Sequence, residues 1–136
     1  MTPEERLIRY AKINTVSDPE SPTVPSSACQ LDLLKVLKAE MEQMGIQEVR
    51  EDRGYLYGRI PSNLDFEVPT VGFIAHMDTA PDFCGEGVNP RIVSNYDGKD
   101  IQLNDQITLK VSDFPNMQRY VGQDLIVTDG NTLLGA

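Results

Sequence analysis

The segment that most constrains the fold of this chain is the nearly continuous apolar run Thr70-Val71-Gly72-Phe73-Ile74-Ala75. Such a run is typical of a strand buried on both faces, because a half-exposed strand alternates apolar and polar residues. A strand buried on both faces needs neighbouring strands at its edges and covering layers above and below it. The run therefore predicts the central strand of a sheet.

Two helices are predicted ahead of this run. The first covers Pro3 to Ile13, where Thr2 can cap the N-terminus and Pro3 takes the first helical position. The second runs from Ser26 or Ser27 to Met44, and Gly45 is well placed as the left-handed residue after its C-terminus. Its buried face is predicted from the apolar side chains at helical spacing, which are Leu33, Leu37, Met41 and Met44.

Shorter strands are predicted before and after the central run. Ile46 to Arg50 and Tyr55 to Ile60 read as two strands joined by the turn-prone Asp52-Arg53-Gly54. Loops are predicted over Pro61 to Pro69 and over Thr79 to Pro90, because both are rich in turn-forming residues. The remaining strand-like pieces are Arg91 to Val93, Ile101 to Leu103, Ile107 to Val111 and Leu125 to Thr128, with a last hairpin from Asp129-Gly130 through Thr132 to Leu134.

These elements predict an α/β fold, with a mixed sheet and two N-terminal helices. A parallel sheet normally has helices on both faces, and no second set of helices follows the central strand. We therefore expect residues 1–136 to form one part of a larger domain that is truncated before the rest of it.

Composition excludes several classes of function. The 136 residues carry a formal net charge of −9, which argues against nucleic-acid binding because phosphates require a basic surface. No long apolar stretch indicates a membrane segment, and the charged residues 1–10 do not resemble a signal peptide. The two cysteines, Cys29 and Cys84, form no C-x-x-C pattern and are expected to be free thiols. We expect a cytoplasmic location.

The chemistry is predicted at the end of the central run, where the chain's single histidine, His76, is followed by Asp78. Sites in α/β folds gather beyond the carboxyl ends of strands. Residues two apart in an extended chain project to the same side, so this imidazole and carboxylate can share one space. The carboxylate can then bind one ring nitrogen and leave the other for a metal.

A purely structural role for this pair is the main alternative, since a lone H-x-D is a weak signal and one histidine cannot hold zinc by itself. The loop acids Asp82 and Glu86 are interpreted as solvated residues, although either carboxylate could serve a metal or a substrate amine. Cys84 has no second histidine that could activate it as a nucleophile.

Three stretches of the sequence show a resemblance to a known family. Residues Val71 to Asp82 closely resemble the motif around the first zinc ligand in the peptidase T family, the tripeptide aminopeptidases among the dinuclear-zinc exopeptidases. Val88 to Tyr96 is similar to the loop that follows, and Thr128 to Ala136 resembles the run that leads to the metal-bridging acid. The two N-terminal helices and Val24-Pro25-Ser26 also fit, so the resemblance covers essentially the whole chain.

The resemblance implies a function and a role for each matched residue. His76 corresponds to a zinc ligand and Asp78 to the active-site aspartate that orients it. A full-length relative would release the N-terminal residue of a small tripeptide with the help of two zinc ions and a glutamate that transfers a proton. The bridging aspartate, the other ligands, that glutamate and a dimerisation domain would all lie beyond Ala136, so the chain itself is expected to be inactive and to bind no zinc tightly.

Two other functions remain open. One is a different zinc exopeptidase or an amino-acid deacylase of the same clan, and the other is a non-catalytic α/β binding domain. If the chain is an N-terminal fragment of the catalytic domain, we expect an exposed apolar face and self-association through it.

Overall fold

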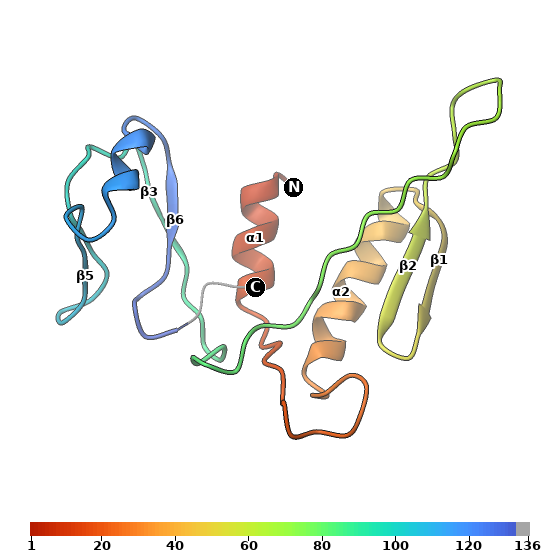
Figure 1. Cartoon of the computed structure of the whole chain (residues 1–136), viewed down its shortest axis with the longest axis horizontal. Helices are drawn as coiled ribbons and strands as arrows, with labels where there is room; N and C mark the ends of the chain where they lie inside the picture. Colours follow the sequence, from red (N-terminus) through yellow and green to blue (C-terminus); the bar gives the residue numbers. More distant parts are fainter. Residues whose placement is uncertain (133–136) are drawn as a thin grey trace. The chain divides into compact units, whose positions relative to one another are not determined.

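The computed structural model describes residues 1–132, which form two compact units. Of the described residues, one unit contains 1–14 and 81–132, and the other contains 15–80. Figure 1 shows the elements of both units. The predicted last hairpin through Leu134 lies partly outside the described residues.

The first helix, α1 (Pro3–Ala11), begins at the capping residue that the sequence predicts. Glu5 N–H donates to Thr2 Oγ1 at 3.3 Å, and Thr2 N–H donates to Glu5 Oε2 at 2.8 Å. This reciprocal pair is a capping box, which satisfies two backbone donors that the helix leaves free. The helix ends earlier than the predicted Ile13, because Lys12 already takes the C-cap position.

The second helix, α2 (Gln30–Gln43), packs on the hairpin of β1 (Gln47–Asp52) and β2 (Tyr55–Arg59). Leu33 of the predicted apolar stripe is buried, whereas Met44 at the end of that stripe is exposed. Gly45 has a φ of 76°, which confirms the predicted left-handed position after the helix. The helix starts later than predicted because residues 26–29 form bends and a turn.

The β1–β2 hairpin confirms its predicted strands and turn. Arg53 and Gly54 have φ values of 50° and 82°, as the tight turn of a two-residue hairpin requires. Gln47 pairs with Arg59 and Arg50 with Tyr57, so two residues of β1 face only Gly58 of β2. Gly58, opposite this bulge, is closely packed. A Cβ there would lie 2.7 Å from Ile46 Cγ2 and 2.3 Å from Met41 Cε.

In the unit of residues 1–14 and 81–132, the strands form short antiparallel pairs. β3 (Arg91–Val93) pairs with β6 (Leu125–Val127), and β4 (Ile101–Gln102) pairs with β5 (Thr108–Leu109). A short 3-10 helix, η1 (Pro115–Tyr120), lies between β5 and β6 in the sequence. The buried core of this unit consists of Tyr96, Ile101, Met117 and Val127, with Val93, Leu103, Leu109 and Leu125 packed against it.

The predicted central strand is wrong for the described chain. Residues 70–75 are extended but form no strand, and the side chains of Phe73 and Ile74 are 96% and 101% exposed. A mixed sheet does not form either, because the described strands pair only as three separate antiparallel ladders. An apolar run becomes a buried strand only where other strands satisfy its backbone groups, and residues 1–132 place none beside it.

Gly58→Ala is expected to lower the free energy of unfolding by about 1–3 kcal/mol, because the new methyl group must displace the β-branched side chain of Ile46. Gly72→Ala is the matched control: no atom lies within 4 Å of a Cβ at that position. It should change stability by less than about 0.5 kcal/mol. Urea unfolding of both variants measures the difference, and equal effects would contradict the close packing at Gly58.

Candidate functional site

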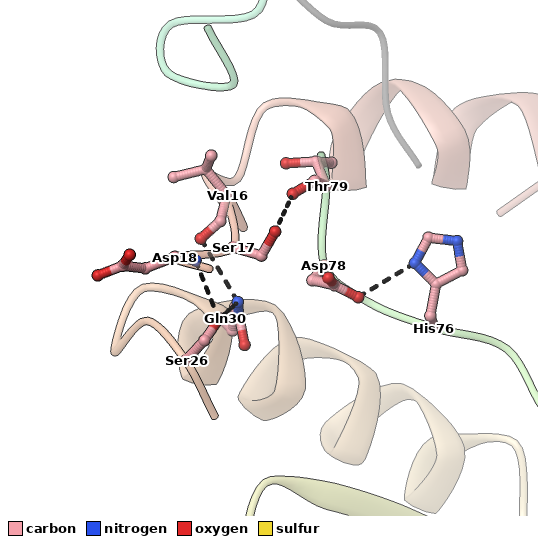
Figure 2. A network of polar contacts seen from close by, with 8 residues as sticks. All are labelled: Val16, Ser17, Asp18, Ser26, Gln30, His76, Asp78 and Thr79. Carbon is pink, nitrogen blue, oxygen red and sulfur yellow. Dashed lines mark hydrogen bonds and ion pairs between the residues drawn. The ribbon is translucent and has the colours of Figure 1, made fainter. Parts of the chain in front are cut away.

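The predicted pair forms in the structure. His76 Nδ1 lies 3.1 Å from Asp78 Oδ1, and Figure 2 shows the two side chains pointing toward one another. A carboxylate oxygen accepts, so the bond assigns the ring proton to Nδ1 and leaves the lone pair of Nε2 free for a metal. Both side chains are accessible, with exposed fractions of 68% and 45%. An exposed pair of this kind contributes only about 0–1 kcal/mol to stability, so its value lies in orienting the ring.

Thr79, the residue after Asp78, is hydrogen-bonded to a part of the chain that is distant in the sequence. Thr79 N–H donates to Thr15 O at 3.0 Å, and Ser17 N–H donates to Thr79 O at 2.9 Å. The Ser17 hydroxyl donates to the same carbonyl at 3.0 Å. Val16 and Thr79 thereby form a parallel bridge, and Thr79 is buried. Asp78 is thus held at its C-terminal side by three hydrogen bonds.

A cavity of about 770 Å³ lies beside the pair within residues 15–80. His76 and Asp78 line it together with the extended residues before them. Its other walls come from α2 and from the turn and first residues of β2, and include Leu31, Leu37, Met41, Gly54 and Leu56. The pair therefore faces an open space with mainly apolar walls.

The described residues do not offer a complete set of metal ligands. Among residues 1–132, no group of three or more His, Cys, Asp or Glu side chains could hold a metal ion. Asp82 and Glu86 are exposed, in agreement with solvated loop residues. Cys84 is a free, exposed thiol. The donor chemistry of His76 fits zinc, which commonly binds imidazole nitrogen, while the described residues supply no group of three donors around it.

The turn after β6 is held by its own acid. Asp129 Oδ1 accepts from Asn131 N–H at 2.9 Å and from the Thr132 hydroxyl at 3.2 Å. The hydrogen bond from the Asn131 backbone, with smaller ones from Thr132 and Thr128, lowers the pKa of Asp129. Asn104 Nδ2 donates to the backbone carbonyl of Asp129 at 2.7 Å. The carboxylate therefore stays ionised and fixes this turn.

Sequence reasoning found His76 and Asp78 but missed Ser17, which is 62 residues away from its partner Thr79. No local motif marks Ser17, because its role depends on a long-range contact.

None of the helices in residues 1–132 has the length and apolar character needed to cross a membrane.

Asp78→Ala is expected to shift the tautomer of His76. Loss of a hydrogen bond of about 1 kcal/mol changes the ratio of the two neutral tautomers roughly fivefold, toward the form protonated at Nε2. The imidazole ¹⁵N shifts at alkaline pH measure this ratio, and the signal is unambiguous because the chain has one histidine. Asp65→Asn, which changes an exposed loop carboxylate, is the control. Identical shifts in wild type and Asp78→Ala would contradict the pairing.

Comparison with known proteins finds similarity to curated proteins named peptidase T. No family model matches the chain. The chain is 53% identical over 133 residues to peptidase T of Lysinibacillus sphaericus strain C3-41, and 51% identical over 135 residues to peptidase T of Clostridium botulinum strain Hall. Peptidase T of Desulfitobacterium hafniense strain DCB-2 is 49% identical over 134 residues.

These matches cover 97% of the chain but only 32% to 33% of each relative. The chain thus spans about a third of the length of the curated relatives it matches. Over that third, about half of the residues are identical, which is far more than a shared fold requires. The resemblance to peptidase T that the sequence indicates is therefore confirmed over nearly the whole chain.

Proposed function

We propose that the chain is the N-terminal part of the catalytic domain of a zinc-dependent aminopeptidase that releases the N-terminal residue of tripeptides. The observation that carries the proposal is the His76–Asp78 pair. It forms a hydrogen bond in the orientation that a metal ligand needs, within a stretch that resembles the first zinc-ligand motif of peptidase T. The near 50% identity to peptidases T over this region supports the same assignment.

Each residue has a distinct task in this proposal. His76 Nε2 binds zinc, and Asp78 keeps the proton on Nδ1 so that Nε2 stays available. When bound, a pair of zinc ions supplies the activation of water and the polarisation of the scissile carbonyl. The other ligands, the general-base glutamate and the dimerisation domain would be supplied by residues that correspond to the unmatched two thirds of the relatives. The chain alone would then be inactive.

The cavity beside the pair supports a small substrate. Its volume of about 770 Å³ lies within the range of roughly 300–1,000 Å³ that is typical of small-ligand sites. Its apolar walls would suit aliphatic or aromatic side chains of a peptide. The net charge of −9 argues against a nucleic-acid substrate. A cytoplasmic location remains a prediction from the sequence.

The test uses a chimera in which this chain is joined to the unmatched remainder of the Lysinibacillus sphaericus relative. With zinc added, the chimera is expected to release the N-terminal residue from a tripeptide, as followed by chromatography. His76→Ala should reduce hydrolysis to background, because a zinc ligand is lost. Asp78→Ala should reduce it about 10- to 100-fold, as expected for a group that orients a ligand. Asp65→Asn is the matched control and should retain full activity.

Other outcomes favour the other functions. Hydrolysis of dipeptides or acylated amino acids in place of tripeptides would favour another hydrolase of the same clan. A folded chimera that binds no zinc and leaves all these substrates intact would favour the non-catalytic binding domain. Full activity of the His76→Ala chimera would contradict the assignment of His76 as a zinc ligand.

We also propose that the isolated chain associates with itself through residues 70–75. Val71, Phe73 and Ile74 are largely exposed, and this window contains neither charge nor proline. Such segments tend to pair with strands of other chains. Sedimentation velocity at rising concentration should show oligomers for the wild type and a monomer for Phe73→Lys. Lys35→Glu, on the exposed side of α2, is the control. A wild type that stays monomeric at every concentration contradicts the proposal.

A further inference from the structure

We propose that Ser17 and Gln30 are positioning residues for the His76–Asp78 pair, an inference that rests on the proposed function for its catalytic meaning. Figure 2 shows the contact of Ser17 with Thr79 and those of Gln30 with Val16 and Ser26. Neither residue contacts a reacting atom in this scheme. They act by fixing the backbone on which the metal ligand is carried.

The extended segment that carries His76 has few attachments. In the described chain, the first backbone hydrogen bonds after β2 that join this segment to another part of the molecule are those of Thr79. Asp78 immediately precedes this anchor, and His76 lies three residues before it. The direction in which the pair projects therefore depends on how firmly Thr79 is held.

Ser17 supplies two of the three hydrogen bonds at the anchor. Its backbone N–H and its hydroxyl both donate to Thr79 O, at 2.9 and 3.0 Å. A carbonyl with two donors has both of its lone pairs engaged, which restricts rotation of the peptide unit more than one bond does. The hydroxyl is the only part of this arrangement that depends on the side chain of residue 17.

Gln30, in the first turn of α2, holds the segment that contains Ser17. Its Nε2 donates to Val16 O at 3.4 Å and to Ser26 Oγ at 3.1 Å. Ser26 Oγ in turn accepts from Asp18 N–H at 3.1 Å. The Gln30 side chain belongs to a residue that is only 8% exposed, so its amide would be costly without these partners. The helix is thus linked through residues 16–18 to Thr79 and the metal-ligand pair.

Precise support matters for a metal ligand. Groups that orient a ligand change metal affinity or activity by about 10- to 100-fold when they are removed, although they never touch the metal. Positions within about 0.5 Å are needed for a productive site. An exposed His76–Asp78 pair has little packing of its own to provide this precision, so the anchor is the main source of it.

The first test measures the geometry of the pair in this chain without metal or substrate. In Ser17→Ala and Gln30→Met, the imidazole ¹⁵N shifts of His76 are expected to move toward those of Asp78→Ala. Ser17→Thr retains the hydroxyl and should restore the wild-type shifts. Ser62→Ala removes an exposed serine hydroxyl that accepts from Leu64 N–H within its own loop, and it should leave the shifts unchanged. If Gln30→Met does not fold, the result for Ser17→Ala decides. That variant keeps both backbone hydrogen bonds of the anchor, from residue 17 N–H to Thr79 O and from Thr79 N–H to Thr15 O.

The second test uses the chimera with zinc. Ser17→Ala is expected to lower kcat about tenfold with little change in KM, and Ser17→Thr to recover it. Folded Ser17→Ala with unchanged His76 shifts and an unchanged kcat would show a merely structural role and overturn the inference. An inactive unsubstituted chimera would instead overturn the proposed function, while the ¹⁵N shifts would still decide whether Ser17 and Gln30 position the pair.

Discussion

The pairing of Thr79 with Thr15 and Ser17 is the interaction on which the candidate site depends. It joins two stretches that are more than 60 residues apart, as the separation of 62 between Ser17 and Thr79 shows. Each such hydrogen bond contributes about 0.5–1.5 kcal/mol net. One opposing feature is the Thr79 hydroxyl, which is buried and has no partner among residues 1–132. An unsatisfied group of this kind costs about 1–3 kcal/mol, so the anchor is stable only because several bonds act together.

The His76–Asp78 pair has a different kind of importance. Its hydrogen bond joins two accessible groups and contributes little to folding. Its effect is on the ring: it decides which nitrogen carries the proton and where the other one points. Thr79 is buried and holds the backbone, whereas Asp78 and His76, one and three residues before it, are accessible and line an open cavity.

The sequence predicted the local elements well, because their signals are local. The cap at Thr2, the left-handed Gly45 and the turn at Arg53-Gly54 each follow from the conformational preference of one or two residues. The predicted order of the short strands is also confirmed. The pair at His76 was found because residues two apart in an extended chain share a side.

The prediction was wrong where it depended on distant partners. Residues 70–75 have the composition of a buried strand, but burial is a property of the surroundings, and residues 1–132 provide no adjacent strand. Ser17 and Gln30 were missed for the same reason, since their partners lie far away in the sequence or are backbone atoms that no motif records. Asn104, which holds the backbone of Asp129 from 25 residues away, is a further case.

The packing of α2 on the β1–β2 hairpin has a consequence for how the chain acquires its structure. These three elements occupy one continuous stretch from Gln30 to Arg59, so their contacts close only short loops. The β3–β6 pair, in contrast, joins Arg91 to Val127, and the anchor at Thr79 closes a longer loop still. Because the entropic cost of loop closure rises with loop length, the helix and hairpin form a part of the chain with low contact order. During synthesis this stretch emerges from the ribosome before residues 70–79 do, and would offer them an ordered surface.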